Sequence, residues 1–104
     1  MSKISSNGNG QLKSMSDLEG KAIEFPVTFE LKAVMQGSGN DTESKSKLAV
    51  VFLQFKVKHD YLHKKVSSKG TYTSFTFRVN LKSRKQMDDL YAALKGVDGL
   101  KFAV

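Results

Sequence analysis

The sequence predicts an α+β domain in which one four-stranded antiparallel sheet carries two helices on one face. Three observations predict it. Two long segments alternate apolar and polar residues, as half-buried strands do. Two others place apolar residues three and four positions apart, as amphipathic helices do. The segments follow the order strand, helix, strand, strand, helix, strand along 104 residues, a length that suits one domain.

The chain opens with a stretch rich in serine, asparagine, glycine and lysine. Residues 1–20 carry too little apolar surface to offset the cost of ordering, so we expect a disordered leader followed by one domain over residues 21–104. Beyond Phe25 and Pro26, apolar residues recur at every second position and predict the first strand: Val27, Phe29, Leu31, Ala33 and Met35. The turn-forming run from Gly37 to Asn40 ends it.

The first helix is predicted by a cap and by an apolar stripe. Asn40 can cap the helix, and Glu43 stands three residues later, as a capping box requires. One helical face then collects four apolar side chains: Leu48, Val51, Phe52 and Phe55. The alternative is that the run from Leu48 to Leu53 is a short buried strand.

Two strands and a turn follow. Residues 59–67 have the length of a strand but little amphipathicity, which predicts an edge strand. The run from Ser67 to Gly70 consists of residue types that are typical of a turn. Residues 71–81 alternate again. The inward side chains are expected to be Phe75, Phe77, Val79 and Leu81, and the outward ones Tyr72, Ser74, Thr76, Arg78 and Asn80.

The C-terminal part predicts the second helix and the last strand. Ser83 and Gln86 have capping-box spacing, and Gly96 suits the helix end. The helical stripe consists of Met87, Leu90, Tyr91 and Leu94. The last strand is expected to point three side chains inward: Leu100, Phe102 and Val104. With right-handed crossovers the result is a ferredoxin-like βαββαβ plait with the first and third strands in the middle.

Three motifs resemble those of the YbeD-like family, small bacterial proteins without an established function. They are Phe25-Pro26 with K-A-V-M-Q-G (residues 32–37), S-S-K-G-T-Y (residues 67–72), and the run from Leu90 to Val104. Val66 departs from the family pattern, which often has proline there. The resemblance implies a ferredoxin-like fold similar to that of regulatory ACT domains, which bind small effectors.

The resemblance also implies two candidate loops. In ACT domains the loop after the first strand helps to hold the effector, and here it contains Gly37, Gly39 and Asp41. The alternative is a plain flexible connection. The family motif loop consists of Ser67, Ser68, Lys69, Gly70 and Tyr72. Its alternative reading is a turn in which Lys69 serves solubility and Tyr72 packs on a neighbour.

The formal net charge of +7 suggests an anionic partner. Residues 56–85 hold nine basic side chains against Asp60 alone, so any electrostatic hypothesis belongs there. Because the N–H groups of a helix start favour anions, the beginning of the second helix is a candidate anion site: Lys82, Ser83, Arg84 and Lys85. The alternative is that Asp88 and Asp89 neutralise Arg84 and Lys85 from four residues away.

The stretch from Lys69 to Phe77 tests one nucleic-acid function. In an RNA recognition motif, aromatic residues occupy the third and fifth places counted from the basic residue, and here those places are Thr71 and Thr73. Phe75 and Phe77 share the parity of the core, which leaves Tyr72 as a single outward ring. One ring is a poor stacking platform, so the pattern argues against RNA reading.

Several classes are excluded by what the sequence lacks. There is no nucleophile elbow and no phosphate loop, so we expect no enzyme and no cofactor. His59 and His63 lie about 13 Å apart on a strand, too far to share a metal ion. No apolar run of about 18 residues could span a membrane. The absence of cysteine and of a signal peptide fits a cytoplasmic protein.

The sequence therefore predicts a small non-catalytic regulatory or interaction module, monomeric or homodimeric. Its partner would be a protein or a small molecule that binds at the edge strands or at the open sheet face. That face is expected to present Glu30, Lys32, Tyr72 and Arg78. The alternative, from another class, is weak and nonspecific binding of nucleic acid or another polyanion through residues 56–85.

Overall fold

The computed structural model describes residues 23–37 and 40–104. The predicted leader and Gly39 of the candidate effector loop lie outside these residues. The elements follow the predicted order: β1 (Val27–Gln36), α1 (Asp41–Gln54), β2 (Lys58–Val66), β3 (Tyr72–Leu81), α2 (Arg84–Leu94) and β4 (Leu100–Ala103).

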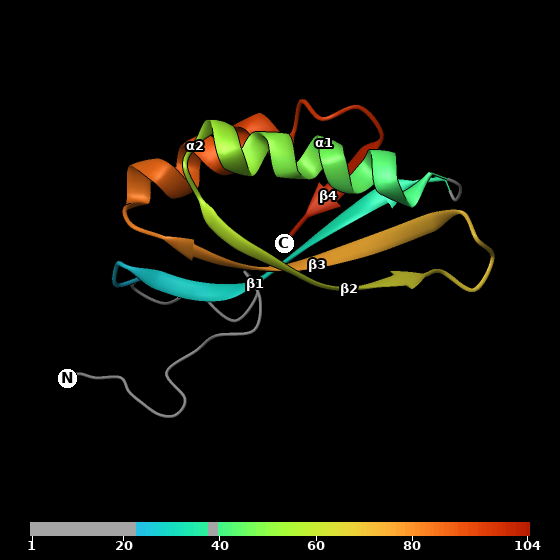
Figure 1. Ribbon diagram of the computed structural model, residues 1–104, viewed down its shortest axis with the longest axis horizontal. Helices are drawn as coiled ribbons and strands as arrows, with labels where there is room; N and C mark the ends of the chain where they lie inside the picture. The colour runs from blue at the N-terminus through green and yellow to red at the C-terminus, as the bar shows by residue number, and fades with distance from the viewer. Residues whose placement is uncertain (1–22, 38–39) are drawn as a thin grey trace.

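The four strands form one antiparallel sheet in the order β2-β3-β1-β4. Both helices lie on one side of this sheet (Figure 1). The first and third strands are central, as right-handed crossovers predict. The ferredoxin-like plait is therefore confirmed, and β2 and β4 form its two edges.

The core lies between the sheet and the helices. Phe75 and Phe77 are only 1% and 3% exposed, so the predicted parity of β3 is confirmed and neither ring is available for stacking on RNA. Opposite them in the register, β1 buries every second residue, and α1 and α2 complete the core with Leu48, Val51, Phe52, Met87, Leu90 and Leu94. Burying each such side chain stabilises the fold by about 1.5–3 kcal/mol.

Both helices begin at the predicted caps. The side chain of Asn40 accepts a hydrogen bond from the backbone N–H of Glu43 (2.9 Å), and that of Ser83 accepts one from the backbone N–H of Gln86 (3.1 Å). The alternative of a strand over Leu48–Leu53 is wrong, because this run lies within α1. The cap fixes the first turn, and the apolar stripe then faces the sheet.

The last strand corrects one prediction. Leu100 pairs with Met35 and Ala103 with Ala33, but the register shifts between them, so that Phe102 pairs with Val34. Residues directly opposite each other share a face, so Phe102 lies on the open face, where its side chain is 50% exposed. Val104 exchanges both backbone hydrogen bonds with Lys32 and follows Phe102 to that face. The expectation that these two side chains point inward is wrong.

A second register shift, between Tyr61 and His63, divides the two histidines of β2. His59 pairs with Val79 on the core side and lies 4.8 Å from the ring of Phe52, whereas His63 pairs with Thr76 on the open face. Thr76 has the predicted outward parity and is nevertheless only 3% exposed. In the register Thr76 stands between Lys32 of β1 and His63 of β2.

The helix ends are closed in two ways. After α1, Lys56 adopts a left-handed conformation (φ 58°), and the N–H of Val57 donates to the carbonyl of Phe52 (2.8 Å). This is a Schellman motif with lysine where glycine is usual. Gly96 stands where the predicted stop of α2 requires it but does not adopt positive φ, and Gly99 does (φ 89°). The second helix therefore ends by a different turn from the one expected.

Candidate functional site

The candidate effector loop and the family motif loop meet at one end of the sheet. Gly37 donates its backbone N–H to the carbonyl of Thr71 (2.6 Å), and the hydroxyl of Thr73 donates to the carbonyl of Gly37 (3.5 Å). The two segments are more than thirty residues apart in the sequence. The pairing of β1 with β3 brings them together, because Gln36 lies opposite Tyr72.

The hairpin between β2 and β3 is shaped by Ser67 and Gly70. The N–H of Gly70 donates to the carbonyl of Ser67 (2.9 Å), and Gly70 adopts the positive φ (72°) that the turn needs. The hydroxyl oxygen of Ser67 accepts a hydrogen bond from the N–H of Tyr72 (3.1 Å). Ser68 and Lys69 form the exposed tip. The turn interpretation of this motif therefore accounts for Ser67 and Gly70.

A pocket of about 180 Å³, here called the polar pocket, opens beside these two loops. Its lining comes from β1, from the start of α1 and from β3: Gln36, Gly37, Asn40, Asp41, Glu43, Ser44, Lys47, Thr73 and Phe75. Both signs of charge are present, together with amide and hydroxyl groups. Such a lining suits a small polar ligand that carries both charges or several hydrogen-bonding groups.

Ion pairs order the charges around the polar pocket. Lys64 of β2 pairs with Asp41, and this hydrogen bond raises the pKa of the lysine above its usual value. Lys47 lies 4.0 Å from the carboxylate of Glu43 and 3.6 Å from that of Asp98. Because the Lys47 ammonium is shared between two exposed carboxylates, it is held near the pocket without being neutralised by a single close partner.

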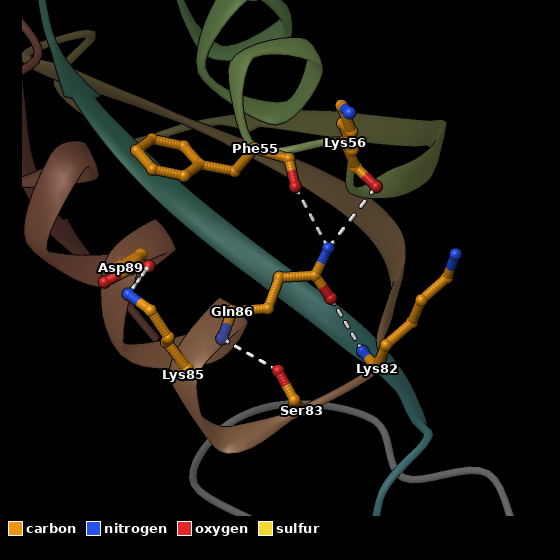
Figure 2. Close-up of a pocket in the computed structure, with 7 residues that line it drawn as sticks. All are labelled: Phe55, Lys56, Lys82, Ser83, Lys85, Gln86 and Asp89. Atoms are coloured by element: carbon orange, nitrogen blue, oxygen red, sulfur yellow. Dashed lines mark hydrogen bonds and ion pairs between the residues drawn. The ribbon is translucent and has the colours of Figure 1, made fainter.

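The candidate anion site lies at the start of α2, which follows the other end of β3. Figure 2 shows Lys82, Ser83 and Lys85 of this site. Lys85 pairs with Asp89 at 2.9 Å, and this hydrogen bond raises the pKa of the lysine. Arg84 lies over the ring of Phe25, 5.8 Å from its centroid. The charge of Lys85 is therefore partly neutralised by Asp89, as the alternative predicts, whereas Arg84 contacts an aromatic ring instead of a carboxylate.

Gln86 occupies the centre of this region. Its side-chain oxygen accepts the N–H of Lys82 (2.6 Å), one residue before the cap, where a capping box would reach the cap residue itself. Its amide N–H₂ donates to the carbonyls of Phe55 (3.0 Å) and Lys56 (3.3 Å), as Figure 2 shows. Gln86 thus ties the end of α1 to the start of α2.

Around Gln86 lies an open pocket of about 380 Å³, here called the lysine pocket. It is lined by Phe55, Lys56, Lys82, Ser83, Lys85, Gln86 and Asp89. Three lysines from two distant segments therefore surround it, with one carboxylate among them. Chemically this pocket can attract an anion, but it offers no enclosed wall.

The basic segment does not form one surface. Lys64 turns to the helix side, while Lys58, Lys65 and Arg78 have the parity of the open face. In the register Arg78 lies between Glu30 of β1 and Asp60 of β2, so two acids flank it. The positive charge of residues 56–85 is therefore divided between the two faces and is partly offset by neighbouring strands.

Two further findings concern residues 23–37 and 40–104. No three His, Asp or Glu side chains gather there as a metal site would require. None of the helices formed by these residues is long and apolar enough to cross a membrane.

Comparison with known families matches residues 20–104 to the family described as a protein of unknown function, DUF493. The chain belongs to the DUF493 family. Among relatives of this DUF493 chain, a UPF0250 protein of Shewanella woodyi is 40% identical over 80 residues, which cover 76% of this chain and 86% of the relative. A UPF0250 protein of Shewanella piezotolerans is 41% identical over 80 residues, which again cover 76% of this chain and 86% of the relative. The resemblance to the YbeD-like family is confirmed.

Two solved structures share the fold of this DUF493 protein. The solution structure of HP0495 from H. pylori gives a TM-score of 0.61 at 15% identity, over 86% of this chain and 92% of that one. The ACT domain from the GTP pyrophosphokinase of Chlorobium tepidum gives 0.50 at 13% identity, over 74% and 94%. The second structure confirms that the fold is ACT-like.

Of the nine residues that line the polar pocket of this DUF493 protein, only Gly37 and Asp41 were candidate site residues in the sequence, and Ser44, Lys47 and Thr73 are among those that it missed. Thr73 could have been found, because it has the parity of Phe75 and lies on the same strand as the motif loop. Ser44 and Lys47 follow the predicted cap of α1 within two turns, but no sequence pattern indicates that this part of the helix turns toward Thr73.

Proposed function

We propose that this DUF493 protein is a small non-catalytic regulatory module that binds a small polar effector in the polar pocket. The meeting of the β1–α1 loop with the start of β3, through Gly37 and Thr71, carries the proposal. The loop that the ACT resemblance implies for effector binding therefore lies beside a pocket lined with both signs of charge. A zwitterion such as an amino acid fits this lining, with its carboxylate toward Lys47 and its ammonium toward Asp41 or Glu43.

The sequence supports a non-catalytic role. The chain holds no nucleophile elbow, no phosphate loop and no cysteine, the last of which also supports a cytoplasmic location. One structural neighbour is the ACT domain from a GTP pyrophosphokinase, so a domain of this fold occurs within an enzyme. In this proposal the DUF493 module couples effector binding to a partner, which is the role that the resemblance to regulatory ACT domains implies.

The test is an NMR titration of the full chain with amino acids, with nucleotides and with a short oligonucleotide. We expect one amino acid or nucleotide to shift the backbone amides around the polar pocket, at Gly37, Ser44, Lys47 and Thr73. Lys47→Gln should weaken that binding about threefold, the worth of one exposed charge contact. Lys45→Gln on the same helix is the matched control, because Lys45 lies over the ring of Tyr61 instead.

Shifts confined to the open sheet face would contradict the effector proposal and would indicate a protein-binding surface in its place. The same holds if Lys45→Gln weakens binding as much as Lys47→Gln does.

A second candidate, polyanion binding, is favoured by the three lysines around the lysine pocket (Figure 2). A short oligonucleotide should then shift Lys56, Lys82 and Lys85, and its affinity should fall steeply between about 50 and 200 mM salt. Lys82→Gln should reduce the slope of log affinity against log salt by about one. A small-effector contact would change far less with salt, so the titration separates the two candidates.

A further inference from the structure

The outer edge of β4 presents backbone groups that no neighbouring strand pairs. Among the described residues β1 is the only strand beside β4, and Lys32 exchanges both backbone hydrogen bonds with Val104 (2.9 Å each). Bonded and non-bonded pairs alternate along an antiparallel ladder, so Phe102 also turns its backbone groups to Val34, whereas Ala103 lies in a non-bonded pair. The N–H and C=O of Ala103 therefore point away from the sheet.

The same alternation leaves one more backbone group free. In a trans peptide the C=O and the N–H that follows it point in opposite directions. Because the N–H of Phe102 points to β1, the C=O of Lys101 points outward. The edge thus offers a donor at Ala103 and acceptors at Ala103 and Lys101. Since β4 has four residues, these groups can pair a short extended segment but not a long one.

A pocket of about 240 Å³, here called the edge pocket, runs along this edge. It is lined from the end of α2 and from β4: Tyr91, Leu94, Lys95, Leu100, Lys101, Phe102 and Ala103. Ala103 has the parity of the core and Phe102 that of the open face, so the lining comes from both faces of the sheet. A hollow lined from both faces lies at the edge itself, where a side chain of an added strand can enter it.

Beside the edge pocket, the open face carries an exposed aromatic side chain. Phe102 is 50% exposed and lies opposite Val34, and Val104 follows it on the same face. Successive side chains of a strand alternate between the two faces. A strand added to β4 therefore places one side chain in the edge pocket and its neighbours on Phe102 and Val104.

The charged side chains around this edge are basic. Lys95 and Lys101 line the edge pocket and are exposed, and Lys32 stands opposite Val104 on the open face. Among the described residues, no carboxylate lines the edge pocket. Two copies of this chain paired through β4 would bring these lysines together, and like charges disfavour such a pairing. The edge therefore suits an acidic segment better than a second copy.

We propose that β4 pairs with a short extended segment of a partner protein, in which acidic side chains flank apolar ones. The segment runs antiparallel to β4, because in that arrangement one residue exchanges both hydrogen bonds with Ala103. Its central side chain enters the edge pocket, and its acidic side chains lie near Lys95 and Lys101. The edge pocket shares no residue with the polar pocket, so this proposal is independent of effector binding.

The probe is the peptide acetyl-Glu-Val-Leu-Val-Glu-amide, titrated into the full chain and followed by NMR. We expect it to shift the amides of Leu100–Val104 and to slow hydrogen exchange at Ala103, whose N–H has no strand partner without the peptide. Exchange at Phe102 should change little, because its N–H is already bonded to β1. A peptide that shifts other amides instead would overturn the proposal.

Two altered peptides test the backbone bonds and the charges separately. N-methylation of the central leucine removes the donor to the C=O of Ala103 and should weaken binding about fivefold. Replacing both glutamates with lysine should weaken it about tenfold. Equal affinity of the N-methylated peptide would overturn strand pairing, and equal affinity of the lysine peptide would overturn the choice of an acidic partner.

Two variants of the protein test the same edge from its own side. Ala103→Pro removes only the outward N–H, at an edge position where proline is tolerated, and should weaken the peptide about fivefold. Phe102→Ala should also weaken it about fivefold, through lost apolar contact. Val66→Ala, which alters a 45% exposed residue at the end of the other edge strand, is the matched control and should have no effect. A folded Phe102→Ala protein that binds like the wild type would overturn the proposal.

Dilution of the protein alone tests a second copy as the occupant. We expect the amide shifts of residues 100–104 to be independent of protein concentration. Shifts that move with concentration, together with a dimer that Phe102→Ala dissociates, would overturn the proposal and assign the edge to a second copy.

Discussion

At the scale of single residues, the backbone at Lys56 is unusual, because a side chain with a Cβ atom occupies a left-handed conformation (φ 58°). The Schellman motif that ends α1 imposes this conformation, since Val57 must turn back to donate to Phe52. Glycine has no Cβ and adopts the same conformation without steric cost. The backbone at Lys56 is therefore strained, and the hydrogen bond and packing between Val57 and Phe52 hold it in this conformation.

We therefore predict that Lys56→Gly stabilises the protein. The strain relieved is about 1–2 kcal/mol and the added entropy of the unfolded chain about 0.4–1 kcal/mol, which leaves a gain of about 0.5–1 kcal/mol. Urea denaturation at constant slope measures it. Lys56→Ala is the matched control, because it removes the same charge but keeps the Cβ, and it should give no gain. Equal gains for both variants would assign the effect to charge.

Tyr91 provides a prediction for pH. Its pKa is raised in the folded state by burial, whereas in the unfolded chain it is about 10. Above pH 10 the unfolded chain loses this proton and the folded protein keeps it, so the free energy of unfolding falls as pH rises. The fall for this one group is about 1.4 kcal/mol per pH unit. Below pH 10 its contribution is constant.

The measurement is the free energy of unfolding from pH 8 to 11.5 for the wild type and for Tyr91→Phe. Lysine titration affects both proteins alike, so their difference isolates Tyr91. The wild type should lose stability relative to the variant only above pH 10. Parallel curves over the whole range would show that the hydroxyl reaches water in the folded state.

Most buried strand residues could be predicted because apolar residues stand at every second position. The exceptions lie where the strand register shifts. Phe29 and Phe77 could be assigned to the core because a pleated strand alternates its faces and the pairing of β1 with β3 has no register shift. Phe102 could not, because one extra residue between Leu100 and Phe102 reverses the alternation. The sequence L-K-F-A carries no sign of that bulge. Thr76 was placed on the correct face, but its low exposure of 3% does not follow from the alternation of β3.

At the scale of elements, the caps of both helices were predictable because they are local, and the tie between the helices was not. Gln86 was recognised as a capping residue from its distance to Ser83. Its bonds to Phe55 and Lys56 span about thirty residues and depend on how α1 packs against α2. The meeting of Gly37 with Thr71 is of the same kind, since only the pairing of β1 with β3 creates it.

We predict that Gln86→Met destabilises the protein by about 1–2 kcal/mol, because the carbonyls of Phe55 and Lys56 and the N–H of Lys82 lose their partner. Methionine keeps the length and helix propensity of the side chain. Lys85→Met, one position earlier and exposed, removes only an ion pair and should cost less than about 0.5 kcal/mol. Thermal and urea denaturation check both variants. Equal losses would mean that the hydrogen bonds of Gln86 contribute no more to stability than the exposed ion pair of Lys85.

At the scale of the whole molecule, the order of the strands followed from two facts about the sequence. The first and third strands have the cleanest alternation, and right-handed crossovers place those two in the centre. The edges are then β2, whose lysines hinder pairing with another chain, and β4, which is only four residues long. Function could not be read in the same way, because the pockets form where loops from different elements meet.

The domain boundary gives the last prediction. The DUF493 match begins at residue 20, and the apolar alternation begins at Val27, so residues 1–19 share neither feature. We predict that a chain lacking residues 1–20 keeps the free energy of unfolding and its slope against urea. The slope decides the matter, because it scales with the surface exposed on unfolding. A lower slope together with a lower midpoint would show that the leader buries surface on the domain, and the boundary would then move toward the N-terminus.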